Sequence, residues 1–176
     1  MDKNSKIRTI HRWKRISLIE EHLDLPNGKQ IVHTTLQHPG AAVILPITSA
    51  GKIVMVNQYR PSLKKWLLEL PAGTLEAEED ATQCASRELT EETGYIANQL
   101  FPLGQVTPLA GFCDEIQYLY VAKDLIKTDN TNCDDDEVIE VVELEIDELE
   151  KQIKEGVLTD AKTIACLCKA KLCGYI

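Results

Sequence analysis

The segment 73–95, with the sequence GTLEAEEDATQCASRELTEETGY, outlines a helix by capping signals at both of its ends. Asp80 is a favourable N-cap residue, and Gln83 follows three positions later, as in a capping box. Gly94 is typical of the left-handed residue that ends a helix. The sequence therefore predicts one helix over 81–93, and the remaining segments have to be placed around it.

Three glutamates near the end of this helix lie on its apolar side. At about 100° per residue, Glu88 and Glu92 project in the same direction, and Glu91 lies about 60° away. The side chains that project with them are small and apolar (Ala81, Cys84 and Ala85), whereas Gln83, Ser86 and Thr90 form the opposite side. A run of charged residues is ordinarily a solvated face, but this pattern predicts that the carboxylates point inward.

Carboxylates that share one helix face repel each other. At a separation of roughly 5 Å and an effective dielectric of ~20, the repulsion is about 3 kcal/mol per pair. A cation that neutralises them would remove this cost, and oxygen ligands without histidine favour Mg²⁺ or Mn²⁺. The four histidines (His11, His22, His33 and His38) lie in the N-terminal region without metal-ligand spacing, so no zinc site is expected.

Short apolar runs separated by turn residues predict strands before and after the helix. Pro26-Asn27-Gly28 is a strong hairpin signal between the first two runs, and Pro71-Ala72-Gly73 is predicted to be a loop. The order of the elements indicates a mixed α/β layered domain. The predicted strands are 7–23, 29–38, 41–47, 53–59, 66–70, 99–107, 116–122 and 138–145, and the predicted final helices are 147–155 and 160–173.

The composition limits the partners of the chain. Its 176 residues suffice for one domain, and its net charge of −9, from 28 acidic and 19 basic residues, disfavours binding to nucleic acid or a membrane surface. The N-terminus lacks the apolar core of a signal peptide, and no stretch approaches ~18 apolar residues. The six cysteines form no CxxC pair and are expected to be reduced thiols. We therefore expect a cytoplasmic protein.

The spacing of the charged residues resembles a known motif. Gly73, Glu79 and the run Arg87-Glu88-Leu89-Thr90-Glu91-Glu92-Thr93-Gly94-Tyr95 match the Nudix box along its whole length. The chain is thus similar to Nudix hydrolases. The resemblance implies the α/β Nudix fold, a mixed β-sheet sandwiched between helices, over 39–176. Residues 1–38 then form an added N-terminal β-hairpin that serves dimerisation or substrate binding.

The resemblance also implies roles within the box. Glu88 and Glu92 would be the principal metal ligands, Glu91 a weaker ligand or a support, and the backbone carbonyl of Ala72 would complete the shell. Glu91 and Arg87 would take part in catalysis, although an alternative for Arg87 is a surface helix pair with Glu91. The structural positions of the box are Gly73, Glu79 and Gly94, and Glu79 with Arg87 would hold the loop to the helix.

Segments outside the box resemble one subfamily. Gln58-Tyr59-Arg60-Pro61, Glu69-Leu70-Pro71-Ala72-Gly73 and Leu158-Thr159-Asp160-Ala161 are similar to segments of ADP-ribose pyrophosphatases and related nucleotide-sugar diphosphatases. The resemblance implies that Arg60 meets the diphosphate or the distal sugar and that Glu69 belongs to the substrate site. A surface arginine at a strand end is the alternative for Arg60.

Other substrate contacts are implied by position. Trp13 would stack on the base, with the N-terminal strands crossing to a second subunit of a homodimer, although packing within the hairpin is an alternative. Gly111 and Glu115 resemble the substrate loop. Ala110 departs from the proline common in ADP-ribose pyrophosphatases, which leaves room for other nucleotide sugars.

A late acidic loop supplies a further candidate. In several Nudix relatives a glutamate before the last strand acts as catalytic base or metal ligand, and Glu137 is the matching position. Asp136 and Glu140 are the next candidates, and a solvated acidic loop without a catalytic part is the alternative.

The resemblance implies Mg²⁺-dependent hydrolysis of the diphosphate bond of ADP-ribose or a related nucleoside diphosphate sugar. The products would be a nucleoside monophosphate and a sugar phosphate. One alternative is hydrolysis of another nucleotide, such as a damaged nucleoside triphosphate or a dinucleoside polyphosphate. A second alternative is a Nudix-fold module that binds nucleotide without catalysis, although such modules would be expected to lose box glutamates.

Overall fold

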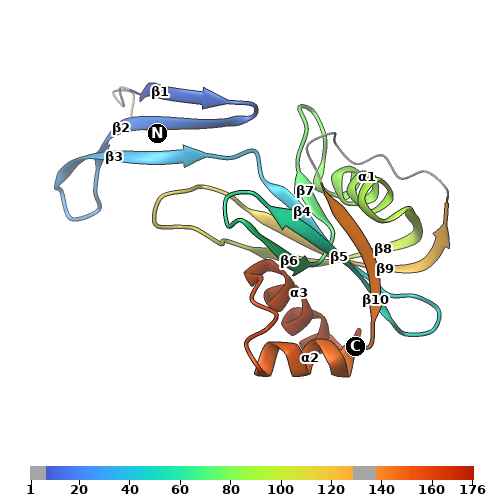
Figure 1. The fold of residues 1–176 in the computed structure, drawn as a ribbon. Coiled ribbons are helices and arrows are strands. Elements are labelled where there is room, and N and C mark those ends of the chain that lie inside the picture. Colours follow the sequence, from blue (N-terminus) through green and yellow to red (C-terminus); the bar gives the residue numbers. More distant parts are fainter. Residues whose placement is uncertain (1–6, 129–137) are drawn as a thin grey trace.

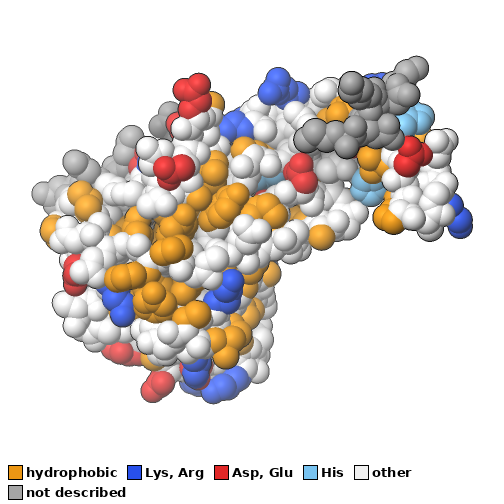
Figure 2. Space-filling view, turned by 180° about the vertical axis from the view of Figure 1, so that it is seen from behind, with side chains coloured by type: hydrophobic (Ala, Val, Ile, Leu, Met, Phe, Trp, Pro, Cys, Tyr) orange, Lys and Arg blue, Asp and Glu red, His pale blue; other side chains and the backbone are white. Residues whose placement is uncertain are grey.

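The computed structural model describes residues 7–128 and 138–176, and its N-terminal part is a three-stranded antiparallel sheet. The strands β1 (Ile7–Trp13), β2 (Ile16–Asp24) and β3 (Gln30–Gln37) lie in the order β1-β2-β3. The predicted turn at Gly28 is confirmed, because its N–H donates to the carbonyl of Leu25 at 2.8 Å. This sheet projects from the rest of the molecule (Figure 1; Figure 2 shows the same projection from behind).

The prediction of a single strand over 7–23 is wrong, because the chain turns back after Trp13. Lys14 adopts a positive φ of 47°, and Trp13 pairs with Ile16 across the tight turn. Lysine rarely occupies this region of backbone space, which glycine and asparagine favour. The N-terminal element is therefore a three-stranded sheet rather than a two-stranded hairpin.

Two further sheets make up the body of the protein. The first has the order β7-β4-β9-β8, in which only the pair β4 and β9 is parallel, so the sheet is mixed as predicted. The second, β10-β5-β6, is antiparallel, and part of the predicted loop 71–73 instead belongs to β7. The strands are β4 (Ala41–Pro46), β5 (Ile53–Arg60), β6 (Lys65–Glu69), β7 (Ala72–Thr74), β8 (Tyr95–Val106), β9 (Gln117–Lys127) and β10 (Ile139–Leu144).

Helices cover the body on two sides. The helix α1 (Ala81–Thr93) lies on one side, whereas α2 (Ile146–Lys154) and α3 (Ala161–Leu172) lie on the other (Figure 1). Strand β4 is buried along its whole length because both of its faces are covered. These positions confirm the predicted α/β Nudix fold. No helix in the described ranges is both long and apolar enough to cross a membrane.

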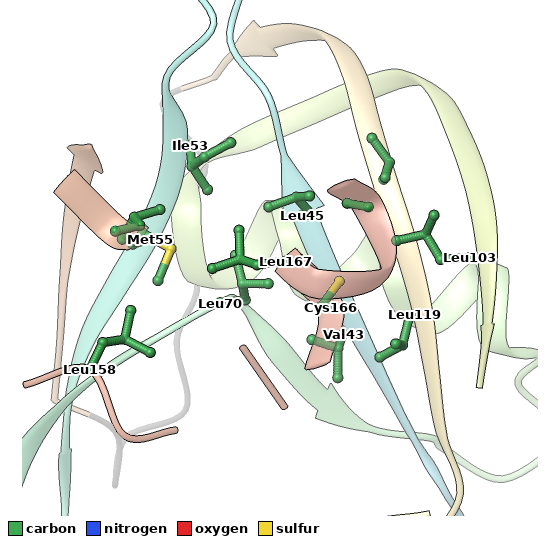
Figure 3. Packing of buried hydrophobic residues seen from close by; sticks show 13 residues of the cluster. Val43, Leu45, Ile53, Met55, Leu70, Leu103, Leu119, Leu158, Cys166 and Leu167 are labelled. Carbon is green, nitrogen blue, oxygen red and sulfur yellow. The ribbon is translucent and has the colours of Figure 1, made fainter. Parts of the chain in front are cut away.

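Alternation along β4 divides the core into two parts. Val43 and Leu45 face α3, where they pack with Leu167 and Cys166 (Figure 3). Ala42 and Ile44 face the opposite way and pack against Cys84, Ala85 and Leu89 of α1. Strand β4 thus holds α1 on the sheet by contacts with the small residues of the helix. The last turn of α1 then lies next to the start of β7, where Glu92 binds Ala72.

Candidate active site

The helix α1 has the bounds and the caps that its sequence predicts. The Asp80 side chain accepts the N–H groups of Thr82 and Gln83 at 2.8 and 2.9 Å, and the Gln83 side chain accepts the N–H of Asp80 at 3.0 Å. At the other end, Gly94 adopts a φ of 71°, and its N–H donates to Thr90. Both ends are therefore fixed, which sets the direction of every side chain between them.

The glutamates of α1 point inward to different degrees. The side chain of Glu88 is 13% exposed and that of Glu91 is 34% exposed, whereas Glu92 is 3% exposed. Cys84 and Ala85 on the same side are buried, and Ser86 on the opposite side is exposed. The inward face that the helical periodicity predicts is therefore confirmed.

Strand β7 lies directly against these carboxylates. The N–H of Ala72 donates to Oε2 of Glu92 at 3.0 Å. At Gly73, an added Cβ would lie 1.8 Å from Oε1 of Glu88, so any other residue would displace the Glu88 carboxylate from its present position. The resemblance implies a metal contact of the Ala72 carbonyl, which stays a prediction; the hydrogen bond to Glu92 involves the N–H of the same residue. The carbonyl of Gly73 is 3.5 Å from Sγ of Cys84.

Arg87 joins the helix to the loop before it. Its Nε and Nη2 donate to the two carboxylate oxygens of Glu79 at 2.8 and 2.9 Å. Its Nη1 lies 2.6 Å from Oε1 of Glu88 and 3.0 Å from Oε2 of Glu91. The hydrogen bond from Arg87 lowers the pKa of Glu79 to about 2 despite the opposing effect of burial, and the N–H of Glu76 adds to that lowering. Arg87 is thus more than the surface partner of Glu91.

Arg87 also supplies part of the positive charge that the glutamates require. Its guanidinium compensates Glu79 by two parallel hydrogen bonds, which leaves Glu88 and Glu91 to share one nitrogen. The mutual repulsion of the carboxylates is therefore relieved in part by the protein itself. One positive charge against three carboxylates leaves a net negative charge here, before the adjacent Glu92 is considered.

The donor chemistry of this cluster fits a hard divalent cation. Glu88, Glu91 and Glu92 offer carboxylate oxygens on one side of α1, next to the backbone of β7. Across residues 7–128 and 138–176, no three aspartate, glutamate, histidine or cysteine side chains already converge as a complete set of ligands. In this structure Glu88 and Glu91 accept hydrogen bonds from Arg87, and Glu92 accepts one from the N–H of Ala72.

A second charged cluster lies at the ends of β5 and β6. Arg60 donates from Nε and Nη2 to the two oxygens of Glu69 at 2.7 and 2.6 Å. Lys162 of α3 also contacts Oε2 of Glu69, and its Nζ lies 3.1 Å from Oδ2 of Asp160. The hydrogen bond to Glu69 is the largest of the effects that raise the pKa of Arg60, and the charge of Glu92 also contributes. The segment 70–72 joins this cluster to the glutamates of α1, because the N–H of Leu70 binds Thr163 and the N–H of Ala72 binds Glu92.

Lys162 and Thr163 are the site residues that the sequence did not reveal. The hydroxyl of Thr163 accepts the N–H of Leu70 at 2.8 Å and donates to Oδ2 of Asp160 at 2.6 Å. Asp160 followed by Thr163 three positions later is the pattern of a helix N-cap, which could have indicated this link. No local pattern points to Lys162, because its partner Glu69 is distant in sequence.

Trp13 lies at the end of the edge strand β1 and is 61% exposed. The turn that follows it reaches the body of the same chain, since Nη2 of Arg15 lies 2.7 Å from Oε1 of Glu76 in the loop before α1. This contact joins the N-terminal sheet to the body of its own chain. It also places the turn next to the box rather than far from it (Figure 1).

Gly111 and Glu115 lie on the loop between β8 and β9. Glu115 accepts a hydrogen bond from Nε2 of Gln117 at 2.9 Å, whereas nothing lies within 4 Å of a Cβ added at Gly111. The N–H of Leu36 donates to the carbonyl of Phe112 at 2.7 Å, which ties this loop to β3. The structure therefore joins the loop to the N-terminal sheet but gives no steric reason for glycine at 111.

Glu137 and Asp136 lie outside the described residues. The chain is described again from Val138, whose carbonyl accepts the N–H of Tyr59 at 3.0 Å, one residue before Arg60. Glu140 is exposed on β10 and accepts a hydrogen bond from Nδ2 of Asn57 at 3.2 Å.

Comparison with known proteins gives consistent matches. The family model of the NUDIX domain matches residues 36–166. A methanol dehydrogenase activator of Bacillus methanolicus is 42% identical over 93% of this chain and 89% of its own length. An ADP-ribose pyrophosphatase of Bacillus subtilis is 39% identical over 88% of this chain and 84% of its own. A solved structure of an ADP compounds hydrolase superposes with a TM-score of 0.81 at 20% identity, covering 94% of this chain and 90% of that one.

Proposed function

The chain belongs to the NUDIX family, and on this premise we propose that it hydrolyses the diphosphate bond of ADP-ribose or a related nucleoside diphosphate sugar with Mg²⁺ or Mn²⁺. Water adds at one phosphorus, the bridging P–O bond breaks, and a nucleoside monophosphate and a sugar phosphate leave. The observation that carries the proposal is that the acidic cluster on α1 lies next to a cluster that contains Arg60 and Lys162. The glutamates of α1 suit a metal ion, and Arg60 belongs to a second cluster that the segment 70–72 joins to Glu92, which suits the diphosphate.

Each charged residue has a distinct part in this proposal. Glu88, Glu91 and Glu92 would hold the cation, which when bound offsets phosphate charge and polarises the phosphorus for attack. Arg87 orients Glu88 and Glu91 through its two short contacts and anchors the loop through Glu79. Positioning and electrostatic stabilisation account for most of the catalysis in phosphoryl transfer, so fixed carboxylates matter more than covalent chemistry.

The nucleobase of the substrate and the attacking water are assigned to residues outside the two charged clusters. Trp13 stacks on the base, from the same subunit or from a second one, and Glu137 orients the water or joins the metal shell. Gly111 and Glu115 contribute the loop that borders the substrate. The support for Trp13 is the contact of Arg15 with Glu76, which brings the β1–β2 turn to the loop before α1.

A panel of nucleotides with added Mg²⁺ tests the proposal. ADP-ribose, other nucleoside diphosphate sugars, nucleoside triphosphates and dinucleoside polyphosphates would be compared by kcat/KM, and the products identified by chromatography. We expect a nucleoside diphosphate sugar to be the best substrate. A triphosphate or a dinucleoside polyphosphate as the best substrate would assign a different Nudix activity, and binding without any turnover would indicate a non-catalytic module.

A second candidate function is the activation of a dehydrogenase. The observation that favours it is the high identity to the methanol dehydrogenase activator across nearly the whole chain. The experiment adds the purified protein to methanol dehydrogenase and measures the rate of alcohol oxidation. Repeating it with Glu92→Gln separates activation that needs the hydrolase site from activation by binding alone.

A further inference from the structure

Glu69 is a buried carboxylate that faces two cations. It is 1% exposed, and both of its oxygens are occupied by Arg60, while Oε2 also contacts Lys162. Burial alone would raise the pKa of Glu69, but the hydrogen bond from Arg60 and the charge of Lys162 lower it below its usual value. Glu69 therefore stays ionised between the two basic side chains.

The charges of this cluster determine how strongly the guanidinium of Arg60 can attract an anionic substrate. If Arg60 were the only partner of Glu69, the pair would be neutral, and the guanidinium would have little net field left for an anion. Lys162 adds a second positive charge, and it is 13% exposed, so solvent screens it weakly. Asp160 pairs with Lys162 and also accepts the N–H and the hydroxyl of Thr163 at 3.0 and 2.6 Å. The positive charges of Arg60 and Lys162 therefore balance the negative charges of Glu69 and Asp160, and loss of Lys162 would leave the cluster negative.

The first turn of α3 is held firmly in place. Asp160 caps the helix, and the fully buried Thr163 binds the N–H of Leu70 at 2.8 Å, next to Glu69 in the sequence. Two residues further along, Ala72 binds Glu92 of the acidic cluster. The turn that carries Lys162 is thus fixed to the segment that lines both clusters.

We propose that Lys162 is a positioning residue that compensates the charge of Glu69, so that the cluster around Arg60 stays neutral instead of negative and the guanidinium can attract the diphosphate of the substrate. Lys162 acts through Glu69 and Arg60 and is not assigned a contact with the reacting atoms. This inference rests on the proposed function, because it concerns the same diphosphate.

The test replaces Lys162 and measures binding as well as turnover. Lys162→Met removes the charge and retains most of the side-chain volume, and Lys162→Gln removes the charge but keeps a hydrogen-bond donor. Affinity for ADP-ribose would be measured by calorimetry in EDTA, where the metal-dependent reaction does not proceed. We expect both variants to bind about tenfold or more weakly, to show a higher KM with a smaller change in kcat, and to be rescued by Lys162→Arg.

The control is Lys171→Met. Lys171 lies on the same helix and forms a surface ion pair with Glu150, which this substitution removes. It should bind and turn over like the wild type. Lys162→Gln with wild-type affinity would show that a hydrogen bond suffices and would overturn the charge role. If Lys162→Met does not fold, as judged by circular dichroism, Lys162→Gln carries the test alone.

A double-mutant cycle with Arg60→Gln separates action through Arg60 from a general loss of structure. If Lys162 acts through Arg60, the combined variant binds ADP-ribose little more weakly than Arg60→Gln alone, whereas additive losses overturn the inference.

The nucleotide panel on the wild type distinguishes failure of the proposed function from failure of the inference about Lys162. A wild type that hydrolyses no nucleoside diphosphate sugar overturns the proposed function and this inference together, whereas an active wild type with unaffected Lys162 variants overturns the inference only.

Discussion

The Cα of Gly73 lies against the carboxylate of Glu88, so that an added Cβ would be 1.8 Å from Oε1 and 1.9 Å from Cδ. These separations are far below van der Waals contact, so a side chain at this position would have to push the Glu88 carboxylate aside. The glycine thus allows β7 to approach the end of the Glu88 side chain, and no left-handed backbone is involved. The absence of a side chain here leaves the Glu88 carboxylate in its present position.

Gly73→Ala is expected to displace the carboxylate of Glu88 and to lower kcat/KM by about 10²-fold, because misplacing a catalytic group by about 1 Å can cost that much. Steady-state kinetics and thermal unfolding would be measured together. Gly51→Asn serves as the control, since nothing lies within 4 Å of an added Cβ at that position and asparagine tolerates a positive φ. Wild-type kinetics of Gly73→Ala would show that Glu88 has no catalytic part.

Glu92→Gln is expected to lower kcat by about two orders of magnitude or more while leaving the fold intact. The amide oxygen can still accept the N–H of Ala72, which Glu92 accepts at 3.0 Å, but the negative charge for the cation is lost. Kinetics over a range of Mg²⁺ concentrations and Mn²⁺ binding by electron paramagnetic resonance would check this. Near-normal kcat at saturating Mg²⁺ would remove Glu92 from the metal site.

Much of the fold follows from short-range patterns in the sequence. The helix α1 begins and ends where its caps predict, because the capping hydrogen bonds of Asp80, Gln83 and Gly94 are made with nearby backbone. The buried strand β4 is equally apparent as an apolar run. The turn at Lys14 was missed because its positive φ occurs without the glycine or asparagine that normally signals it.

The site is less predictable, because its contacts join segments distant in sequence. The periodicity of α1 indicates that Glu88 and Glu92 point inward, but it cannot show that Arg87, which is held by Glu79, offsets part of the charge of Glu88 by direct contact. Lys162 contacts Glu69 because α3 packs on the core and brings the two residues together. Such charge pairs depend on tertiary structure, so local propensity does not reveal them.

The Arg87–Glu79 pair predicts how stability depends on pH. The folded-state pKa of Glu79 is about 2, below its ordinary value of 4.5, so the pair stabilises the fold above about pH 4.5. This contribution is lost as the pH falls from about 4.5 toward 2. The difference in melting temperature between the wild type and Glu79→Gln should therefore be constant near neutral pH and shrink over that acidic interval.

The control for this measurement is Glu155→Gln, which removes the same charge at an exposed position at the end of α2. Its melting temperature should stay close to that of the wild type throughout. A wild-type advantage over Glu79→Gln that is unchanged at pH 2.5 would exclude ionisation of Glu79 as its cause.

Glu137→Gln is expected to lower kcat more than it raises KM, because an orienting or metal-binding carboxylate acts mainly in the transition state. The comparison variant is Glu140→Gln, whose side chain is exposed and accepts a hydrogen bond from Asn57. Single-turnover kinetics would separate the chemical step from product release. If Glu140→Gln shows the larger loss, the catalytic role moves to β10, and if neither changes kcat, the acidic loop is solvated without a part in catalysis.

The exposed edge strand β1 predicts a homodimer formed by the N-terminal sheet. Every residue of β1 is exposed, including the large apolar side chains of Ile7, Ile10 and Trp13. An edge strand with unpaired backbone groups and apolar side chains invites pairing with another chain, and closed two-fold dimers are the commonest assembly. Light scattering at micromolar concentration is expected to report roughly twice the chain mass of 19.7 kDa.

The same assembly would bring Trp13 of one subunit to the substrate of the other. Stacking on a base is worth about 1–3 kcal/mol, so Trp13→Ala should raise KM by about tenfold with little change in kcat. Leu172→Ala, at an exposed apolar position on α3, provides the matched control. A monomeric wild type with an unchanged KM for Trp13→Ala would exclude both roles. A monomer with a raised KM would instead assign Trp13 to its own site, where the contact of Arg15 with Glu76 already holds the turn.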